Sequence, residues 1–470
     1  MVDSPTSGAN AAGRASAPWW HDRRKLAAAI VGAVLVLGGI AFAAYEFLKR
    51  PADVHRDAPI KPQKPPKPVI RTTNWPMFGL NRIHTRYLPA SKVKPPFERI
   101  WKYGDKPLLE FPPIFVKARG LCERGSGLGC HGRLFFVNNN GFAYSLDADT
   151  GKVMWERRIA TRNASSPTYS KGSLYIVNLG PGQVLSLDAR TGRTNWRRPV
   201  PGIAESSPIV VGRRVIFGCD CSPDQLYALD TRSGRTIWAT QLSGAVKGSP
   251  SYERGVIYVG DYGGSMNAVR ARDGAIKWQS SDLGAGLGQG GEFYSTPAVA
   301  FGRVFAGNND DRVYSFDQKT GRLIWSFSTG GYVYSGPAAA DTKDTPPTIY
   351  IGSFDGTIYA LDAKAGEPRW TFDAGGSVIG SLSIIGDIVY GATFEGTTTY
   401  GLGLADGSKK FTYHTGAYMP VISDGRRIYL TGYSSISALK PVEPKRRGGK
   451  KGGDAGGAAP GTGAPGGSPG

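Results

Sequence analysis

The sequence is poor in the residues that build metal and redox sites. It contains only four cysteines and five histidines among 470 residues. No two cysteines are adjacent, no Cys-x-x-Cys-His pattern for covalent haem attachment occurs, and the histidines show no zinc-ligand spacing. No Ser-His-Asp arrangement is indicated either. We therefore expect no catalytic residue, no bound metal and no cofactor.

Acidic residues are scarce as well. Asp and Glu number 37 against 57 Lys and Arg, which gives a net charge of +20. Residues 1–25, 49–71 and 440–470 carry net charges of +2, +5 and +4, so these flanking segments hold 11 of the 20 charges. The excess favours contact with an anionic membrane or wall surface. No basic and aromatic groove motif is present, so we expect no nucleic-acid partner.

The four cysteines form two close pairs in the sequence. Cys122 and Cys130 are eight positions apart, and Cys219 and Cys221 are two apart. If the body of the protein lies outside the cytoplasm, each pair is a candidate local disulfide. Four reduced thiols are the alternative.

One long apolar run without a charged residue occurs, over residues 26–45. About 20 apolar residues are enough to cross a bilayer as a helix. We expect a transmembrane signal anchor over residues 25–48, which contacts the membrane through residues 26–48. A cleaved signal peptide is the alternative, because Ala41-Phe42-Ala43 resembles a cleavage site.

Composition divides the chain into five segments. Residues 1–24 are a short cytoplasmic segment before the predicted helix. Residues 49–71 form a Pro-rich basic linker, which favours an extended spacer. Residues 72–440 hold the globular body. Residues 441–470 are basic and rich in Gly and Pro, and we expect them to be disordered.

Internal repetition is the strongest signal in the body. Seven ungapped segments share one pattern: YSLDADTGKVMW (144–155), LSLDARTGRTNW (185–196), YALDTRSGRTIW (227–238), NAVRARDGAIKW (267–278), YSFDQKTGRLIW (314–325), YALDAKAGEPRW (359–370) and YGLGLADGSKKF (400–411). An alternating strand leads into a turn that needs Gly for a positive φ, and a second strand follows. The last aromatic position recurs every 40–47 residues, the length of four short strands in one propeller blade.

The repeated aromatic residue is best interpreted as the contact between neighbouring blades. One blade cannot bury both of its faces, and a Trp side chain buries about 200 Å². The predicted blade-packing residues are Trp101, Trp155, Trp196, Trp238, Trp278, Trp325, Trp370 and Phe411.

Trp101 lies outside the seven repeats, in the isolated strand FERIWKYG (97–104). Residues 420–440 supply three strands but lack a Gly-x-x-x-Trp strand. Pairing of the two ends would complete one more blade and leave no long free edge. We predict an all-β fold: a monomeric eight-bladed β-propeller of four-stranded blades, closed by an N-terminal strand and preceded by one transmembrane helix.

Hydroxyl and aromatic side chains recur where blades begin. Ser166, Ser207, Ser249 and Thr296 each precede a Pro at the start of an apolar strand. The first strand of a blade lines the central channel, so these residues should lie near one mouth. The candidate ligand contacts there are Tyr294, Tyr332, Tyr334 and Tyr418. Ordinary packing between blades is the alternative for these tyrosines.

The motif of residues 188–192, Asp-Ala-Arg-Thr-Gly, with Trp196 four positions on, resembles the PQQ-like (quinoprotein-type) propeller repeat. The resemblance covers about residues 72–440. Quinoprotein dehydrogenases of this kind have an adjacent Cys-Cys disulfide over the quinone, calcium ligands and an Asp base. Here Asp220 separates the nearest pair, Cys219 and Cys221. The resemblance therefore implies the non-enzymatic BamB-like group, without bound PQQ.

These observations together predict a function in recognition. We expect a propeller on the extracytoplasmic side of a bacterial cell membrane, held by a single-pass anchor. It would serve as a scaffold or recognition module for an envelope protein or polymer. The alternative is a PQQ-dependent or other oxidoreductase.

Overall fold

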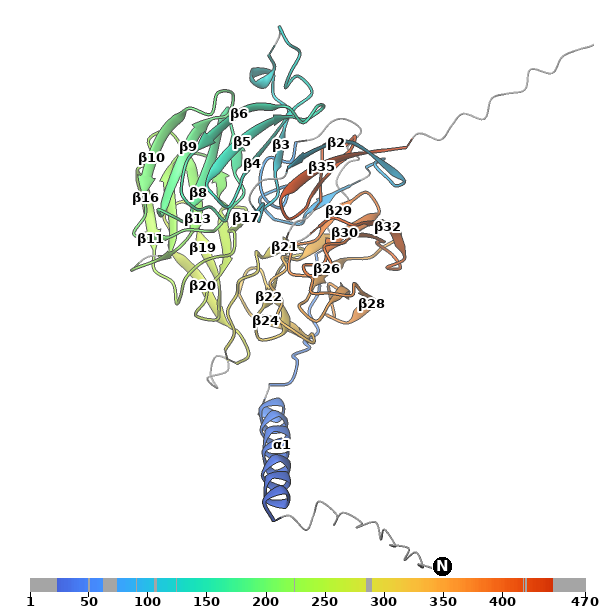
Figure 1. The fold of residues 1–470 in the computed structure, drawn as a ribbon. Coiled ribbons are helices and arrows are strands. Elements are labelled where there is room, and N and C mark those ends of the chain that lie inside the picture. The colour runs from blue at the N-terminus through green and yellow to red at the C-terminus, as the bar shows by residue number, and fades with distance from the viewer. Residues whose placement is uncertain are drawn as a thin grey trace, which may run out of the picture.

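The body of the molecule is a ring of four-stranded antiparallel sheets (Figure 1). The computed structural model describes residues 23–49, 51–61, 74–89, 91–104, 108–123, 125–223, 225–284, 290–416, 418 and 421–442. This part of the chain contains eight such sheets, one of which has a short fifth strand, and one two-stranded sheet. The predicted all-β, eight-bladed propeller of four-stranded blades is confirmed.

We number the blades in chain order and give the strands of each from the inner to the outer edge. Blade 1 contains β3 (Ile114–Val116), β4 (Arg133–Val137), β5 (Phe142–Asp147) and β6 (Val153–Arg158); blade 2 contains β7 (Thr168–Ser170), β8 (Ser173–Asn178), β9 (Gln183–Asp188) and β10 (Thr194–Pro199). Blade 3 contains β12 (Ile209–Val211), β13 (Arg214–Gly218), β15 (Leu226–Asp230) and β16 (Thr236–Thr240); blade 4 contains β17 (Ser251–Glu253), β18 (Val256–Gly260), β19 (Ser265–Arg270) and β20 (Ile276–Ser281).

The second half of the ring continues this order. Blade 5 contains β21 (Ala298–Ala300), β22 (Arg303–Asn308), β23 (Arg312–Asp317) and β24 (Leu323–Ser328); blade 6 contains β25 (Ala338–Ala340), β26 (Thr348–Gly352), β27 (Thr357–Asp362) and β28 (Pro368–Asp373). Blade 7 contains β29 (Ser383–Ile385), β30 (Ile388–Ala392), β31 (Thr399–Gly403) and β32 (Lys409–Tyr413), with β1 (Tyr87–Leu88) parallel to β29 as a fifth strand. Strands β11 (Gly202–Ile203) and β14 (Asp220–Cys221) form the two-stranded sheet.

Blade 8 combines strands from the two ends of the repeat region. Its inner three strands are β33 (Ile422–Ser423), β34 (Ile428–Thr431) and β35 (Ser435–Pro441), and its outer strand is β2 (Phe97–Gly104). β2 pairs antiparallel with β35 and places Trp101 opposite Ala438. The register shifts beside Trp101, as it does beside the aromatic residue of the outer strand in other blades.

Each tryptophan of the outer strands contacts the following blade. Its indole N–H donates to a backbone carbonyl there, at Ala148, Ala189, Thr231, Ala271, Gln318, Ala363 or Leu404. The indole ring also lies over the turn glycine of that following blade. At Gly192 a β-carbon would lie 2.9 Å from the Trp155 ring, and φ is +71°. Glycine is required at that turn both for the backbone conformation and for the close approach of the ring.

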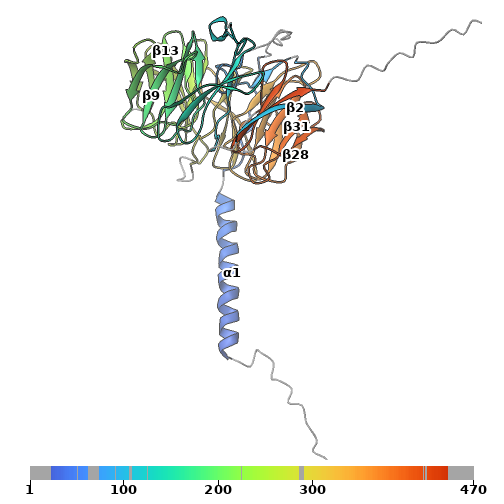
Figure 2. The same ribbon diagram turned by 45° about the horizontal axis from the view of Figure 1, so that its top comes forward.

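Helix α1 (Arg23–Lys49) stands apart from the ring of blades (Figure 2). We predicted a helix over residues 25–48 and expected it to cross a membrane. Within the described ranges, no helix is long and apolar enough to do so. The transmembrane signal anchor is therefore not supported. The predicted cytoplasmic segment up to residue 22 and the basic tail from residue 443 lie outside the described residues.

Residues 51–61, part of the predicted spacer, pair with the outer edge of blade 5 instead of standing free. Arg56 N donates to Ile324 O (2.9 Å), and Ser326 N donates to Val54 O (3.0 Å). Asp53 accepts from Ser328 N at 2.9 Å. This segment therefore extends the sheet beyond β24, which gives the blade a partner for its exposed strand edge. Most of the Pro-rich stretch, residues 62–71, lies outside the described residues.

Residues 74–89, which we call the channel segment, follow the inner edges of the blades. Six of its carbonyls, from Trp75, Pro76, Arg82, Ile83, Thr85 and Arg86, accept from the N–H groups of Phe115, Tyr169, Tyr252, Val299, Ala339 and Ile384. These six N–H groups belong to the innermost strands of blades 1, 2, 4, 5, 6 and 7. The channel segment thus lies at the centre of the ring and bonds to six of the eight blades.

Candidate functional site at the channel mouth

A cavity opens at one end of the central channel, on the side where the blades begin. Its lining residues are Phe78, Glu110, Phe111, Pro112, Lys247, Gly248, Ser249, Tyr294, Thr296, Tyr334, Ile379, Gly380, Ser381 and Tyr418. They come from the loops before six different blades and from the channel segment. The cavity includes three of the four tyrosines proposed from the sequence as ligand contacts.

The tyrosines form a connected aromatic surface. The rings of Tyr294 and Tyr334 are 5.0 Å apart, and Tyr332 stacks on Tyr334 at 6.0 Å. Tyr332 does not line the cavity, but its side chain is 49% exposed beside it. Tyr418, which also lines the cavity, packs on Phe394 at 4.8 Å. These centroid distances are those of ordinary aromatic pairs.

Charged side chains at the cavity come from loops that the repeat pattern does not single out. Lys247 forms an ion pair with Glu205 (3.0 Å) and lies over the ring of Tyr262 at 4.8 Å. Glu110 accepts a hydrogen bond from Asn139 at 3.1 Å. Burial raises the pKa of the Glu110 carboxyl, and the nearby Glu205 raises it further. The lining thus combines five aromatic side chains with one acidic residue, Glu110, and one basic residue, Lys247.

A belt of hydroxyl groups joins neighbouring blades around the channel. Ser166 N donates to Ser207 Oγ (2.9 Å), Ser207 N to Ser249 Oγ (3.2 Å), and Ser249 N to Thr296 Oγ1 (3.0 Å). All four hydroxyl residues are buried. They lie around the channel where the sequence pattern suggested, and their hydrogen bonds lie between blades, so the side chains serve ring assembly as well as the cavity wall.

The floor of the cavity is formed by the channel segment. Phe78 faces the cavity, and the guanidinium of Arg86 lies 5.2 Å from its ring on the buried side. Arg86 Nη1 donates to His84 O and Pro337 O, while its Nε and Nη2 have no partner among the described residues. Burial lowers the pKa of Arg86 to about 9. The channel segment therefore closes the channel with a buried, partly unsatisfied cation.

This geometry does not fit a bound quinone. The cavity volume is about 80 Å³, against roughly 300–1,000 Å³ for small-molecule sites. No cysteine lines it, and the Cys219–Cys221 disulfide is buried beside Phe217 and Tyr227, within a blade. In the described residues no group of three His, Cys, Asp or Glu side chains could hold a metal ion.

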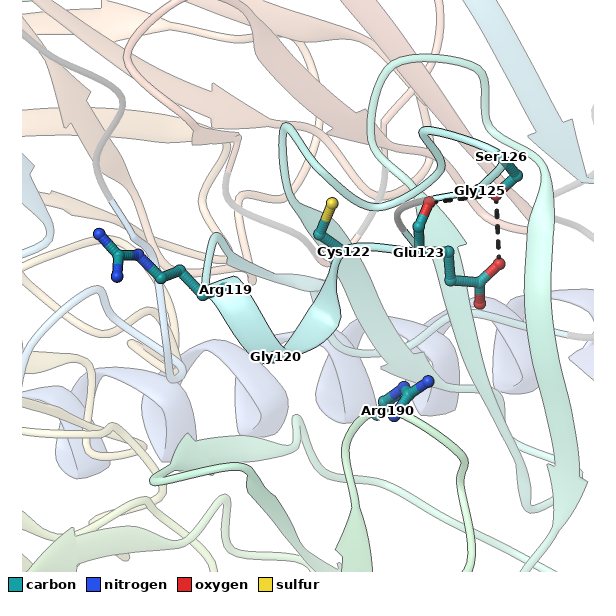
Figure 3. Close-up of a pocket in the computed structure, with 7 residues that line it drawn as sticks. All are labelled: Arg119, Gly120, Cys122, Glu123, Gly125, Ser126 and Arg190. Carbon is teal, nitrogen blue, oxygen red and sulfur yellow. Dashed lines mark hydrogen bonds between the residues drawn. The ribbon is translucent and has the colours of Figure 1, made fainter.

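A second pocket lies at the loop between β3 and β4 of blade 1 (Figure 3). The Cys122–Cys130 disulfide closes this loop, which includes the short helix η2 (Arg119–Leu121). Ser126 Oγ donates to Glu123, and Arg119 points away from both residues. Arg190 comes from the turn of blade 2. Because the two arginines do not converge, the pocket offers no built anion site.

Both disulfides predicted from the sequence are present, and they include all four cysteines. Three components of the channel mouth were missed: Glu110, Lys247 and the channel segment with Phe78. None of them belongs to the repeat. The available signal was that residues 74–94 fit no blade in a chain whose repeats account for the rest of the ring.

Comparisons with known proteins agree with this architecture. A family model described as "Outer membrane protein assembly factor BamB" matches residues 98–223, 221–326, 287–345 and 309–437. A curated protein of that name from Yersinia pestis is 37% identical over 76 residues, which is 16% of this chain and 19% of the relative's length.

Solved structures similar to this chain include a BamB protein and a quinohemoprotein alcohol dehydrogenase. BamB from Moraxella catarrhalis is 17% identical, with a TM-score of 0.57, over 73% of this chain and 99% of that one. The quinohemoprotein alcohol dehydrogenase ADHIIG from Pseudomonas putida HK5 is 13% identical, with a TM-score of 0.64, over 80% and 82%. At these identities the likeness shows the fold alone. The family model, in contrast, matches well over half of the sequence, and the chain therefore belongs to the BamB-like family of PQQ-type propeller repeats.

Proposed function

We propose that this propeller is a scaffold or recognition module for an envelope protein or polymer and that it does not bind PQQ. The observation that carries the proposal is the channel mouth. Its wall is aromatic, its floor is closed by the chain itself, and its volume is below that of a cofactor site. Such a surface suits a side chain that projects from a partner, because Tyr combines apolar area with a hydrogen-bonding tip.

The family of the chain supports the same proposal, since the matching model is named for an assembly factor of the outer membrane. The two disulfides favour an extracytoplasmic location for the propeller, where an oxidising environment maintains them. Thiol labelling in intact cells tests the location. Labelling of Cys122 by a reagent confined to the cytoplasm would contradict it.

Site-specific photo-cross-linking tests the recognition role. A photoreactive residue is placed at Tyr332, which is exposed beside the cavity, and a matched control is placed at Ile237, which is 42% exposed on β16. We expect one discrete cross-linked product from envelope fractions at position 332 and none at position 237. No product at position 332, or the same products at both positions, would contradict a specific recognition surface at the mouth.

The oxidoreductase alternative draws on the likeness to quinohemoprotein alcohol dehydrogenase. It predicts that PQQ with Ca²⁺ raises the melting temperature of the purified chain, because a ligand that binds only the folded state stabilises it. We expect no rise. A rise that saturates with PQQ concentration would favour the enzyme.

A further inference from the structure

The outer edges of blades 1 and 2 carry a concentration of arginine. Arg157 and Arg158 end β6, Arg193 precedes β10, and Arg197 and Arg198 lie within it; all five are exposed. We call these five residues the arginine edge. Residues 157–235 contain 11 Arg and one Lys against five Asp and Glu. This stretch of the propeller therefore carries a large excess of basic residues.

No ion pair neutralises the arginine edge within the described part of the chain. Two of its members are held instead by carbonyls of the next blade: Arg157 Nη2 donates to Thr191 O (3.1 Å) and Arg198 Nη2 to Ser233 O (2.7 Å). These bonds orient the guanidinium groups without cancelling their charge. Arginine presents several donors in a planar fork, which suits a carboxylate or phosphate.

In other blades a short side chain makes the bond to the turn of the next blade. Thr240, which occupies the place of Arg198 in blade 3, donates to Gly274 O at 2.7 Å. Ser280 does the same in blade 4, to Gly321 O at 2.6 Å. A hydroxyl group is thus sufficient to hold the next blade's turn. The long cationic side chains in blades 1 and 2 exceed what packing of the ring requires.

Blade 5 demonstrates what the outer edge of a blade can bind. There Ile324 O and Ser326 N, on either side of Trp325, pair with the extended segment 51–61. The acidic Asp53 of that segment contacts Ser326 Oγ (2.8 Å) and Arg312 Nε (3.3 Å). A fifth strand, with a carboxylate facing a guanidinium, is therefore a packing mode that this repeat accepts.

The outer strand of blade 2 has the same repeat pattern as that of blade 5, so the backbone groups that pair in blade 5 have equivalents there. Trp196 corresponds to Trp325, so Asn195 O and Arg197 N correspond to the two backbone groups that pair in blade 5. Strand β10 pairs with β9 alone, and residues 194–199 have no described partner on the outer side. This edge therefore combines open backbone groups with the guanidinium groups of Arg197 and Arg198.

We propose that the outer edge of blade 2 binds an extended acidic segment of a partner protein, which pairs with β10 as a fifth strand and places its carboxylates against the arginine edge. The proposal rests on the proposed recognition function and names the chemistry of one partner. A polypeptide fits better than a phosphodiester chain, because only a polypeptide supplies alternating N–H and C=O groups to an open strand edge. The segment that already covers β24 is itself a polypeptide, and it places the carboxylate of Asp53 against Arg312.

Fluorescence anisotropy with the full-length chain tests the proposal. The probe is a fluorescein-labelled ten-residue peptide in which Asp alternates with Thr. The comparison peptide alternates Asp with Pro, which keeps the charge but removes alternate N–H donors and resists strand pairing. The test variant is R197T/R198T. The matched control is K409T/K410T, which removes two exposed charges from β32, the outer strand of blade 7.

We expect R197T/R198T to bind the Asp-Thr peptide about tenfold more weakly, and K409T/K410T to bind within about twofold of the original chain. The Asp-Pro peptide should also bind about tenfold more weakly. Inorganic polyphosphate should compete poorly. Equal binding of the two peptides, strong competition by polyphosphate, equal losses in both variants, or no binding at all would each overturn the proposal. Other experiments test the recognition function itself: stabilisation of the chain by PQQ, or an absence of cross-links at Tyr332, would contradict it.

Discussion

The outer edges of blade 5 and blade 2 have the same repeat pattern but different surroundings. In blade 5, residues 51–61 lie against β24 and Trp325 is 0% exposed; in blade 2, β10 is uncovered and Trp196 is 8% exposed. Both tryptophans make the same bond to the next blade. The repeat therefore determines how blades pack on each other. The residues after the Trp, Ser-Phe-Ser in one case and Arg-Arg-Pro in the other, determine what the outer edge can accept.

The largest expected effect is the loss of Trp325. We call residues 51–61, which cover β24, the covering segment. Trp325→Ala removes a fully buried ring that packs on Gly366 and belongs to the same apolar cluster as Ala58 of the covering segment, so we expect the free energy of unfolding to fall by about 3–5 kcal/mol. Trp196→Ala should cost about 1 kcal/mol less, because no segment covers that site. Chemical denaturation of the two variants measures the difference.

Trp325→Phe is the matched control for that experiment, since Phe411 occupies the corresponding position in blade 7. It keeps an aromatic ring but loses the bond from Nε1 to Ala363 O. We expect a loss of about 1–2 kcal/mol. Equal losses for Trp325→Ala and Trp196→Ala would mean that the covering segment contributes nothing to the packing of blade 5.

The second prediction concerns Asp310, which lies next to the residues that hold the covering segment. Asp310 contacts Tyr314 and Arg312, and Asp282 lies nearby. Burial raises its pKa to about 6 despite the opposing effects of Tyr314 and Arg312. The unfolded chain releases this proton near pH 4, so the free energy of unfolding should fall as pH rises from about 4 to 6, by about 3 kcal/mol in total.

Asp310→Asn isolates this contribution from other buried acids such as Glu110 and Asp261, whose pKa values are also raised. The difference between the two stability curves should change by about 3 kcal/mol over that pH range and stay constant above it. A constant difference from pH 4 to pH 7 would show that the Asp310 carboxyl titrates as it does in water.

The contrast between repeat and non-repeat residues also explains what could be predicted. Seven copies of Gly-x-x-x-aromatic reveal the blades, because every blade must bury the same faces. Three of the four proposed tyrosines line one cavity. Residues that precede the first strand of each blade all lie at the same end of the channel, so their position in the repeat was enough to predict this. The covering segment and the channel segment occur once each. Their positions depend on single contacts, such as Asp53 with Ser328 N or Tyr252 N with Arg82 O. Contacts that occur once leave no periodic pattern in the sequence, so they could not be predicted from it.

The third prediction concerns the release of residues 51–61 from the outer edge of blade 5. Asp53→Ala removes contacts to Ser326, Ser328 and Arg312 in a mostly buried setting. We expect a loss of about 2 kcal/mol and faster tryptic cleavage after Arg56. Limited proteolysis followed by mass spectrometry detects the release.

Asp57→Ala is the control within the same segment. Asp57 pairs with Lys364 at 3.1 Å but is 90% exposed, so its loss should cost less than about 0.5 kcal/mol and leave the segment on blade 5. If Asp57→Ala releases the segment as fully as Asp53→Ala does, the carboxylate of Asp53 is not what holds the strand on blade 5.

The smallest expected effect belongs to the uncovered edge. Arg198 donates to Ser233 O from an exposed position, and Thr240 makes the corresponding bond in blade 3 with a hydroxyl group. Arg198→Thr should therefore preserve the contact between blades and change the free energy of unfolding by less than about 0.5 kcal/mol. Arg198→Ala, which cannot make the bond, should cost about 1 kcal/mol. If the Thr variant loses as much as the Ala variant, the guanidinium is needed for the ring itself. If it loses nothing, the charge at this edge is free to serve a partner, as the segment on blade 5 suggests.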